Sequence, residues 1–368
     1  MIKPILIDLI AGARPNFMKI APIIHALIAN NNLIFRLIHT GQHYDKNMSR
    51  VFFEELEIPD PDINLLAGGG TQAEQTAAIM IGYEKVLLEK KSDLCLVVGD
   101  VTSTMACAIV AQKMCIPVAH VEAGIRSGDW TMPEEINRMV TDSITNYFFT
   151  TSDIANENLK KTGVSSENIF FVGNTMIDTL LKNRPKFIQP AIWNQLNLKE
   201  KNFIVITLHR PANVDEETNL KVLIEEIVAN TNELPLIFPV HPRTLKILNH
   251  TGVSHPRLHL IEPLGYLEFN FLVEHSKAVI TDSGGITEET TVMGIPCITL
   301  RDNTERPETI TIGTNELIGT DPKAIKPAME LLFSGKWKKG GIPELWDGHA
   351  AVRIVSCISK LFIKHKIN

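Results

Sequence analysis

The segment Thr-Asp-Ser-Gly-Gly-Ile-Thr-Glu-Glu, residues 281–289, contains the residue types that bind phosphorylated ligands. It follows a short apolar run, so we expect it to join the end of a strand to a helix over Ile286–Met293. The backbone N–H groups of Ser283, Gly284 and Gly285 would then lie at the positive end of that helix, where anions bind. Glycine lets an anion approach the backbone closely. The segment therefore predicts a phosphate site.

Two glutamates complete this segment. Glu288 and Glu289 are expected in the first helical turn, where carboxylates suit the helix dipole, so helix capping is the simplest alternative. A glutamate one turn into the helix can instead accept hydrogen bonds from both hydroxyls of a ribose. A phosphate site beside a ribose site indicates a nucleotide, and the chain lacks the GxGxxG fingerprint that would favour NAD.

A second candidate for phosphate binding is the loop at residues 12–16, Gly-Ala-Arg-Pro-Asn, between the first expected strand and its helix. Arg14 can donate two parallel hydrogen bonds to one phosphate. Lys19 lies in the first turns of that helix, where a cation opposes the dipole. An exposed lysine is an equal alternative for Lys19.

Carboxylates end two apolar runs in the same half of the chain. Asp100 follows Leu-Cys-Leu-Val-Val-Gly, and Glu122 follows Val-Ala-His-Val, so both are expected at one edge of a parallel sheet. Asp100 could merely cap the next helix, whereas a buried Glu122 requires a partner or a function. Glu134 and Arg138 lie four apart on an expected helix and could form only an ion pair. Three carboxylates in one crevice shift each other's pKa and suit proton transfer.

Histidine–arginine pairs follow two expected strands in the second half of the chain. His209 and Arg210 follow one strand, and His241 and Arg243 follow the next. A single histidine is as often structural as functional, but two such pairs favour an anionic ligand. The charged segment 301–308, Arg-Asp-Asn-Thr-Glu-Arg-Pro-Glu, also begins where an expected strand ends.

The elements that would position these residues alternate between short apolar strands and amphipathic helices. This alternation predicts a doubly wound parallel sheet with right-handed crossovers. In the first half we expect strands at Ile5–Ile10, Leu33–Ile38, Leu94–Val98, Pro117–Val121 and Tyr147–Thr150, and helices at Phe17–Ala29, Ala73–Glu89 and Thr102–Met114.

The alternation restarts after a break at Asn183–Pro190, where we place a linker. The sequence thus predicts an α/β protein of two Rossmann-like domains, residues 1–183 and 190–348, with a ligand in the cleft where the strand ends converge. The C-terminal segment 349–368, helical over about His349–Phe362, would cap the second domain or pack back on the first. In the second half we expect strands at Phe203–Thr207, Leu236–Val240, Ala278–Thr281 and Pro296–Leu300, and helices at Glu216–Asn230 and Ile286–Met293.

Composition excludes several classes of function. The net charge is −6 and the chain has no basic block, so nucleic-acid binding is not expected. No apolar stretch approaches a membrane span, and Asp8 interrupts the N-terminal run that superficially resembles a signal peptide, so we expect a cytoplasmic protein with no membrane association. The five cysteines form no CxxC pair and are expected to be reduced thiols, not disulfides or zinc ligands.

Segments spread over both halves resemble one known family, the non-hydrolysing UDP-N-acetylglucosamine 2-epimerases. The resemblance implies the GT-B fold, in which two Rossmann-like domains face each other across a cleft and a last helix returns to the first domain. It also implies a homodimer that acts on a UDP-sugar and uses neither a metal nor nicotinamide. The matching segments run in order from residue 12 to about residue 308 and read GARPNFMK, GQHYDKNM, VVGDVTSTMA, HVEAGIRSGD, PEEINR, GNTMIDTL, TDSGGITEE and RDNTERPE.

The resemblance also implies a reaction and a role for each candidate residue. The family eliminates UDP to leave a glycal, then adds UDP back with the C2 proton delivered to the opposite face, which interconverts UDP-GlcNAc and UDP-ManNAc. Asp100, Glu122 and Glu134 would move protons and stabilise positive charge, and His209 would assist the departing UDP. The diphosphate, the ribose and the rest of the substrate would be held by Arg14, Lys19, Arg138, His241, Ser283, Gly284, Gly285, Glu289 and Arg306.

Two departures from the family pattern leave the identity of the sugar open. The common GTRPE reads GARPN here, which places Ala13 and Asn16 where a threonine and an acid are usual, and LHRPANVD replaces a GHRRE-like run. The alternatives are UDP-2,3-diacetamido-glucuronate as substrate, a hydrolysing relative that releases free ManNAc, a GT-B glycosyltransferase and a non-catalytic sensor of nucleotide sugars. Bacterial members also bind UDP-GlcNAc as an activator, and Gln42, His43 and Arg210 would form that site here.

Overall fold

The chain folds into two compact α/β units. The computed structural model describes residues 4–30, 32–41 and 53–367. One unit comprises Met1–Thr179 together with Glu344–Asn368, and the other comprises Leu180–Pro343. Among the helices described, none combines the length and the apolar character that a membrane crossing requires.

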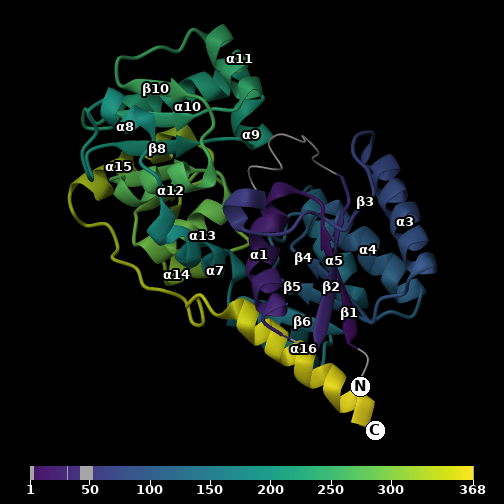
Figure 1. Ribbon diagram of the computed structural model, residues 1–368. Coiled ribbons are helices and arrows are strands. Elements are labelled where there is room, and N and C mark those ends of the chain that lie inside the picture. The colour runs from purple at the N-terminus through teal and green to yellow at the C-terminus, as the bar shows by residue number, and fades with distance from the viewer. Residues whose placement is uncertain (1–3, 31, 42–52, 368) are drawn as a thin grey trace. The chain divides into compact units, whose positions relative to one another are not determined.

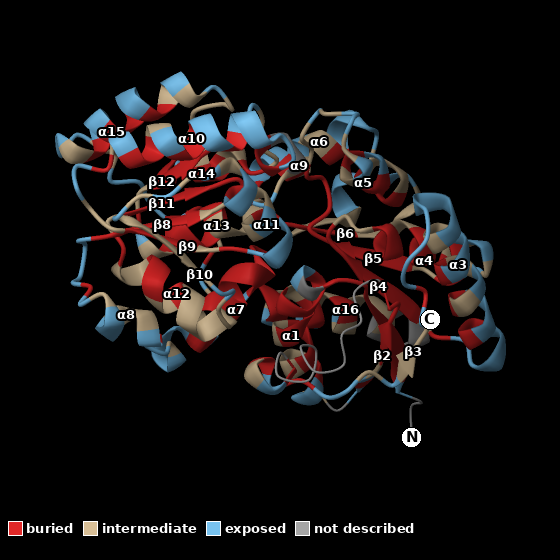
Figure 2. Cartoon of the chain, turned by 90° about the horizontal axis from the view of Figure 1, so that it is seen from above, coloured by how far each residue is buried: buried red, intermediate tan, exposed pale blue. Residues whose placement is uncertain are grey.

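The first unit is built on a parallel sheet in the order β3-β2-β1-β4-β5-β6-β7. The central strands β1 and β4 are buried along their whole length, as expected for strands covered on both faces (Figure 2). Asp8 is the polar exception in β1, and its buried carboxylate accepts hydrogen bonds from Arg36 at 2.8 Å and from the Tyr83 hydroxyl at 2.9 Å. The strands are β1 (Ile5–Ala11), β2 (Leu33–His39), β3 (Ile63–Asn64), β4 (Leu94–Val98), β5 (Val118–Val121), β6 (Tyr147–Thr150) and β7 (Ile169–Phe171).

Helices connect these strands, and the last helix of the chain belongs to the same unit. Helix α16 (Ala350–Ile367) packs against α1 (Figure 1). Its first turn is fixed by Asp178, whose carboxylate accepts hydrogen bonds from the backbone N–H groups of Ala350 at 3.1 Å and Ala351 at 2.7 Å. The other helices along this part of the chain are α1 (Arg14–Ile28), α3 (Gln72–Glu89), α4 (Thr102–Lys113), α5 (Pro133–Ile144), α6 (Asp153–Lys161), η1 (Ser166–Asn168) and α7 (Thr175–Asn183).

The second unit contains a parallel sheet in the order β10-β9-β8-β11-β12-β13. Alternate residues of its strands enter two cores on opposite faces: Ile206 and Ile280 lie in one, and Val205 and Val279 in the other. The strands are β8 (Ile204–Thr207), β9 (Leu236–Pro239), β10 (Leu258–Ile261), β11 (Ala278–Thr281), β12 (Cys297–Thr299) and β13 (Asn315–Leu317).

The helices of the second unit cover both faces of this sheet. Helices α10 and α15 bury one side and expose the other (Figure 2), and their apolar residues join the core that contains Ile206. Leu272 and Val273 of α12 join the core on the other face. The helices are η2 (Arg184–Lys186), α8 (Ala191–Gln195), α9 (Pro211–Val214), α10 (Glu217–Ala229), α11 (Pro242–Thr251), α12 (Tyr266–His275), α13 (Gly284–Met293), α14 (Pro307–Thr311), η3 (Pro322–Ala324) and α15 (Ile325–Phe333).

The predicted fold class, an α/β protein with two Rossmann-like parallel sheets of the GT-B type, is confirmed. Numbered within its own unit, each sheet contains the strand order 3-2-1-4-5-6 of dinucleotide-binding folds. The edge strands β3, β7, β10 and β13 were not predicted, since they are short and mostly half-buried and give little apolar pattern. The segment 183–190, predicted as a linker, contains η2 and precedes α8.

Candidate active site

In each sheet the strand order reverses at one point, between β1 and β4 in the first unit and between β8 and β11 in the second. The helices on either side of such a point leave on opposite faces, so their loops open a crevice at the carboxyl ends of the strands, where ligands bind. The candidate residues follow these strands. Lys19 comes after β1, Asp100 after β4 and Glu122 after β5, whereas His209 comes after β8 and Ser283 after β11.

Asn16 organises the loop after β1. Its Oδ1 accepts hydrogen bonds from the backbone N–H groups of Gly12 at 3.1 Å and Ala13 at 3.0 Å, and its Nδ2 donates to the carbonyl of Val98 at 3.1 Å. The side chain thus ties the loop after β1 to the end of β4. Asn16 is only 2% exposed, so its polar atoms are satisfied within the protein.

Glu122 lies beside Lys19. The Lys19 ammonium donates a hydrogen bond to Glu122 Oε2 at 2.5 Å, and the two side chains are 12% and 2% exposed. Glu122 adopts a positive φ of 69°, a left-handed conformation that is uncommon for residues other than glycine. The pair joins a residue predicted to bind diphosphate to a residue predicted to move protons.

Gly99 packs directly over this ion pair. Its φ is +67°, and a Cβ added to it would lie 3.2 Å from Lys19 Nζ and 3.4 Å from Glu122 Oε2. A side chain here would therefore press on both charged groups and would also adopt a strained backbone conformation. Glycine at this position therefore leaves the contact between Lys19 and Glu122 undisturbed.

Asp100 is held by Arg138, not by the helix that follows it. Arg138 donates to Asp100 Oδ2 from Nε at 3.0 Å and from Nη2 at 2.5 Å, while Asn137 Nδ2 donates to the Asp100 carbonyl at 2.9 Å. The N-cap of α4 is Val101, without a side-chain cap, so the capping alternative for Asp100 is wrong. The guanidinium holds this carboxylate, which is 27% exposed, in one orientation.

The alternative for Glu134 and Arg138, that they merely form an ion pair with each other, is also wrong. Arg138 pairs with Glu135 at 2.8 Å, three residues before it on α5. Glu135 is buried and also accepts hydrogen bonds from the backbone N–H groups of Ser127 and Gly128. Burial alone would raise the pKa of the Glu135 carboxyl, but these hydrogen bonds and the arginine together hold it below its usual value. Glu134 lies in the first turn of α5 and is half-buried, and its carboxylate has no ion pair with any described residue.

A buried histidine supports the turn after β4. His120 Nδ1 lies 2.7 Å from Asp142 Oδ1, and its Nε2 lies 2.8 Å from the carbonyl of Gly99. Arg126 lies 2.7 Å from the other oxygen of Asp142. Although burial would raise the pKa of the Asp142 carboxyl, its contacts with His120 and Arg126 hold it below its usual value. This network fixes the backbone that carries Asp100.

In the second unit, His209 is paired with a buried aspartate. His209 Nδ1 lies 2.7 Å from Asp282 Oδ1, and the two side chains are 60% and 0% exposed. Asp282 also accepts hydrogen bonds from Arg210 N at 2.9 Å and Asn213 Nδ2 at 3.0 Å. Thus the histidine is accessible while its orientation is set from inside the protein.

The predicted anion site at the start of α13 requires two corrections. The helix begins at Gly284, two residues earlier than predicted, so Glu288 and Glu289 lie in its second turn and do not cap it. The N–H of Ser283 donates to Thr281 Oγ1 at 3.0 Å and is not available to an anion, contrary to prediction. The N–H groups of Gly284 and Gly285 remain among the first four of the helix, which have no partner within it.

The two glutamates of α13 are both buried but have different partners. Glu288 accepts a hydrogen bond from Arg306 Nε, and Glu289 accepts one from the Tyr266 hydroxyl at 2.9 Å. Burial raises the pKa of the Glu289 carboxyl to about 7, and the Glu288 charge adds to the effect. Arg306, predicted as a substrate contact, is thus engaged by a buried carboxylate.

Comparison with known proteins decides the family. The model of the UDP-N-acetylglucosamine 2-epimerase family matches residues 25–359. The chain belongs to this family. A UDP-N-acetylglucosamine 2-epimerase of Methanocaldococcus jannaschii is 42% identical over 367 residues, which cover 96% of this chain and 98% of the relative. The crystal structure of the M. jannaschii UDP-GlcNAc 2-epimerase in complex with UDP-GlcNAc and UDP matches with a TM-score of 0.87 and 41% identity, covering 97% of this chain and 100% of that one.

A relative with a different printed substrate is also similar. The UDP-2,3-diacetamido-2,3-dideoxy-D-glucuronate 2-epimerase of Pseudomonas aeruginosa is 37% identical over 357 residues, which cover 96% of this chain and 99% of the relative. The epimerase family therefore includes enzymes named for more than one UDP-sugar, and both kinds align with this chain over nearly its whole length.

Within this epimerase-family chain, His241 has a structural partner of its own. It is the N-cap of α11, where its Nδ1 accepts a hydrogen bond from the N–H of Arg243 at 3.3 Å. Arg243 in turn pairs with Asp215 at 2.7 Å. His241 thus caps the helix that contains Arg243, whereas His209 and Arg210 after β8 both contact Asp282.

The side chains of three predicted residues lie outside the described part of the structure. Arg14 is the first residue of α1, but its side chain lies outside the described part of the structure. Gln42 and His43, predicted for an activator site, lie outside the described residues altogether. Arg210, the third member of that predicted site, donates from Nε to the Asp282 carbonyl at 3.1 Å.

Sequence reasoning assigned no role to several residues that hold the epimerase candidates in place. They are Asn16, His120, Glu135, Asp142 and Asp282. Each is a buried polar residue next to a predicted site residue or in the strand or helix that carries one. A polar residue in a buried position must be hydrogen-bonded. A polar residue within or directly after an apolar run is therefore a signal in the sequence, and it could have identified Asp282 in Thr-Asp-Ser and His120 in Val-Ala-His-Val.

Proposed function

We propose that this chain interconverts UDP-GlcNAc and UDP-ManNAc by epimerising C2 of the sugar. The observation that carries the proposal is the group of Asp100 and Glu122 at adjacent strand ends, each bonded to a cation, in a chain of the UDP-GlcNAc 2-epimerase family. Carboxylates held in fixed orientations are suited to remove a proton on one face and return it on the other.

The reaction requires three kinds of group. A base removes the C2 proton while the bond between C1 and the diphosphate oxygen breaks, which gives UDP and a 2-acetamidoglucal. A proton is then delivered to the opposite face of C2, and UDP adds back to C1. The protein must therefore supply a base, stabilise charge on the departing diphosphate and tolerate positive character at C1.

The first unit supplies the acid–base part of this proposal. Asp100, Glu122 and Glu134 are the proposed catalytic carboxylates, and Arg138 holds Asp100 through two donors. Lys19 has donors beyond the one that it gives to Glu122, so it can contact the diphosphate while it stays in the ion pair. Arg14 is the further proposed diphosphate contact.

The second unit supplies the nucleotide-binding part. The N–H groups of Gly284 and Gly285 and the Ser283 hydroxyl are proposed to bind the diphosphate at the start of α13. His209 is proposed to assist the departing UDP, and Glu289 to accept hydrogen bonds from the ribose. In this role Glu289 would share its carboxylate between the ribose and Tyr266.

One experiment tests the reaction. The chain is incubated with UDP-GlcNAc alone in deuterated water, and the sugar is analysed by NMR and mass spectrometry. Epimerisation predicts deuterium at C2 and a fraction of UDP-ManNAc. A glycosyltransferase would give neither, because it requires an acceptor and leaves C2 untouched, and a sensor would bind UDP-GlcNAc without turnover. The absence of both products would overturn the proposal for this sugar.

A second candidate substrate is UDP-2,3-diacetamido-glucuronate. It is favoured by the similarity to the P. aeruginosa enzyme that carries this substrate in its name, and by the loop that contains Asn16, which departs from the common family pattern. The same exchange assay, run in parallel on the two UDP-sugars, separates the candidates. If deuterium appears at C2 of the diacetamido sugar and not at C2 of UDP-GlcNAc, the diacetamido sugar is the substrate and UDP-GlcNAc is not.

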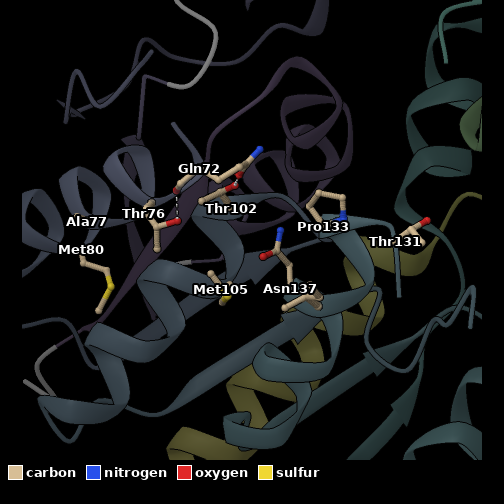
Figure 3. A pocket seen from close by; sticks show the side chains of 11 residues that line it. Gln72, Thr76, Ala77, Met80, Thr102, Met105, Thr131, Pro133 and Asn137 are labelled. Carbon is tan, nitrogen blue, oxygen red and sulfur yellow. Dashed lines mark hydrogen bonds between the residues drawn. The ribbon is translucent and has the colours of Figure 1, made fainter. Parts of the chain in front are cut away.

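The expected homodimer is also a proposal, and helix α3 supports it. This helix is apolar on two sides: Ile79 and Tyr83 are buried in its own unit, whereas Ile81 is 55% exposed and Leu88 is 71% exposed. Other residues of the same helix line a pocket of about 580 Å³ together with residues of α4 and α5 (Figure 3). The pocket is lined by Gln72, Ala73, Thr76, Ala77, Met80, Thr102, Met105, Thr131, Pro133, Ile136 and Asn137.

A second copy of the chain would cover this apolar surface. Light scattering should give twice the mass of one chain for the wild-type protein. The double variant Ile81→Glu/Leu88→Glu should give the mass of one chain. The control is Val222→Glu, at a similarly exposed apolar position on α10, and should keep the larger mass. An unchanged mass for the double variant would place the contact elsewhere.

We also propose a cytoplasmic location. All five cysteines are unpaired, and Cys95, Cys107 and Cys297 are buried. Reduced thiols of this kind are typical of a reducing compartment. Fractionation of cells that express the chain, followed by immunoblotting against a cytoplasmic marker, tests the location.

A further inference from the structure

We propose that Asp282 is the positioning residue for His209, and that it fixes which nitrogen of the imidazole faces a bound ligand. The inference rests on the proposed function only in the role of His209 as the group that assists the departing UDP. The positioning itself is read from the geometry of the second unit.

The Asp282 carboxylate is fully buried and accepts hydrogen bonds on both oxygens. His209 Nδ1 lies 2.7 Å from Oδ1. Oδ2 accepts hydrogen bonds from the backbone N–H groups of His209 at 3.1 Å and Arg210 at 2.9 Å, and from Asn213 Nδ2 at 3.0 Å. Four N–H groups therefore converge on one carboxylate that has no exposed surface.

This environment favours the ionised aspartate. Burial alone would raise the pKa of the Asp282 carboxyl, but the hydrogen bond and charge of His209, together with the Asn213 and Arg210 donors, hold it below its usual value. An ionised carboxylate accepts hydrogen bonds and cannot donate one. The proton on His209 must therefore reside on Nδ1, which leaves Nε2 as the nitrogen that changes its protonation state.

The exposed fraction of the histidine shows that a ligand can reach its side chain. The His209 side chain is 60% exposed although its Nδ1 is bonded to a fully buried carboxylate. A neutral imidazole fixed in this way presents Nε2 as an acceptor, and a protonated one presents Nε2–H as a donor to a diphosphate oxygen.

The same aspartate ties the His209 loop to the neighbouring strand ends. Asn213 Nδ2 also donates to the carbonyl of Leu300 at 3.1 Å, and Arg210 Nε donates to the Asp282 carbonyl at 3.1 Å. Arg210 also lies 3.9 Å from Glu305, which in turn pairs with Arg301 at 2.6 Å. Asp282 thus sets the position of the backbone as well as the tautomer of the ring.

Because of these contacts, the conservative variant Asp282→Asn is the appropriate test. Asparagine keeps the shape and can still accept from the backbone, but its amide can also donate to Nδ1 and so permits the other tautomer. We expect kcat to fall by about 100-fold or more, as for other histidines that lose a fixed tautomer, with a smaller change in KM. The pH profile of kcat should change as well.

A readout independent of turnover is the tautomer of His209 in ¹⁵N-histidine-labelled protein, assigned by comparison with His209→Gln. Long-range ¹H–¹⁵N spectra of the full chain at alkaline pH should show the proton on Nδ1 in the wild type and a mixture of tautomers in Asp282→Asn. The control is Asp178→Asn, which removes a buried aspartate that accepts two backbone N–H groups in the first unit. It should lower the melting temperature but leave the His209 signals unchanged.

Each outcome has a defined meaning. A folded Asp282→Asn protein whose His209 tautomer matches the wild type would overturn the positioning role. The same NMR change in a chain that epimerises none of the tested UDP-sugars would support the positioning role and overturn the proposed reaction. If Asp282→Asn does not fold, the wild-type spectrum still decides, because a proton on Nε2 of His209 would contradict the inference.

Discussion

The Lys19 ammonium lies 2.5 Å from the Glu122 carboxylate, and this contact joins α1 to the end of β5. The two side chains are 12% and 2% exposed, so both charges are largely removed from water. When one member of a buried pair is removed, the other loses its counter-ion in a medium of low dielectric constant. The pair therefore couples the stability of the first unit to the proposed carboxylate chemistry.

This coupling predicts a non-additive pair of variants. Lys19→Met should lower the free energy of unfolding by about 3 kcal/mol, because the buried Glu122 carboxylate loses the charge and the hydrogen bond of Lys19. The double variant Lys19→Met/Glu122→Gln should recover much of that loss. Urea denaturation followed by circular dichroism measures both. Lys160→Met, which breaks the exposed pair with Glu157, is the control and should cost far less. A loss in the double variant equal to the sum of the losses in Lys19→Met and Glu122→Gln would show that the two residues are not coupled.

Gly99 gives a second prediction, with a matched control at Gly252. Both have a φ of +67°, so an alanine at either position should cost about 1–2 kcal/mol in backbone strain. At Gly252 the new Cβ meets no atom within 4 Å, whereas at Gly99 it would press on Lys19 and Glu122. Gly99→Ala should therefore reduce the rate of C2 deuterium exchange at least tenfold, and Gly252→Ala should leave it near the wild-type rate. Parallel thermal melts separate the loss of stability from the loss of rate.

The adjacent glutamates of α5 give a third prediction. Glu135 is buried and bonded to Arg138, Ser127 and Gly128, so Glu135→Gln should lower the free energy of unfolding by about 2–3 kcal/mol. Glu134→Gln should leave stability unchanged, since Glu134 is half-buried and has no ion pair with the described residues, but it should slow C2 exchange by about 100-fold if it transfers a proton. Chemical denaturation and the exchange assay on both variants test this division. A Glu134→Gln protein with full exchange activity would remove Glu134 from the catalytic group.

Much of the fold could be predicted from the sequence because buried parallel strands are continuous apolar runs. Ile5–Ile10, Leu94–Val98 and Ala278–Thr281 were each predicted to within one residue of the observed strands. The start of α13 was misplaced because two glycines, poor helix formers, occupy its first turn. There the tertiary structure overrides local propensity.

The candidate site could be predicted in outline, because strand ends mark where polar residues gather. The partner of each charged residue could not be predicted, since it depends on three-dimensional geometry. Arg138 lies three residues from Glu135 and four from Glu134, and both spacings allow an ion pair on a helix. The sequence does not show which glutamate turns inward, or that Arg138 also reaches Asp100 from α5. The pairing of His209 with Asp282 likewise joins residues 73 positions apart.

The raised pKa of Glu289 gives a fourth prediction. Because the folded protein holds this proton more tightly than the unfolded chain does, ionisation destabilises the fold as the pH rises from about 4.5 to about 7. Glu289→Gln cannot ionise and can still accept the hydrogen bond from Tyr266. The difference in melting temperature, Glu289→Gln minus wild type, should therefore be several degrees larger at pH 8 than at pH 5. Differential scanning calorimetry at both pH values measures it, and a difference that does not change with pH would contradict the burial of this charge.

The same substitution tests what Glu289 binds, and Gly284→Ala provides the contrast. If Glu289 accepts the ribose hydroxyls, Glu289→Gln should weaken UDP by about tenfold and leave pyrophosphate unaffected, since it removes a charged acceptor from the nucleoside end only. A Cβ at Gly284 would lie at the start of α13, 2.9 Å from Glu305 Oε1, where the diphosphate is proposed to bind. Gly284→Ala should therefore weaken UDP and pyrophosphate alike. Calorimetric titration of UDP and of pyrophosphate into each variant measures these affinities. If Glu289→Gln loses the same affinity for UDP as for pyrophosphate, this carboxylate lies outside the ribose site.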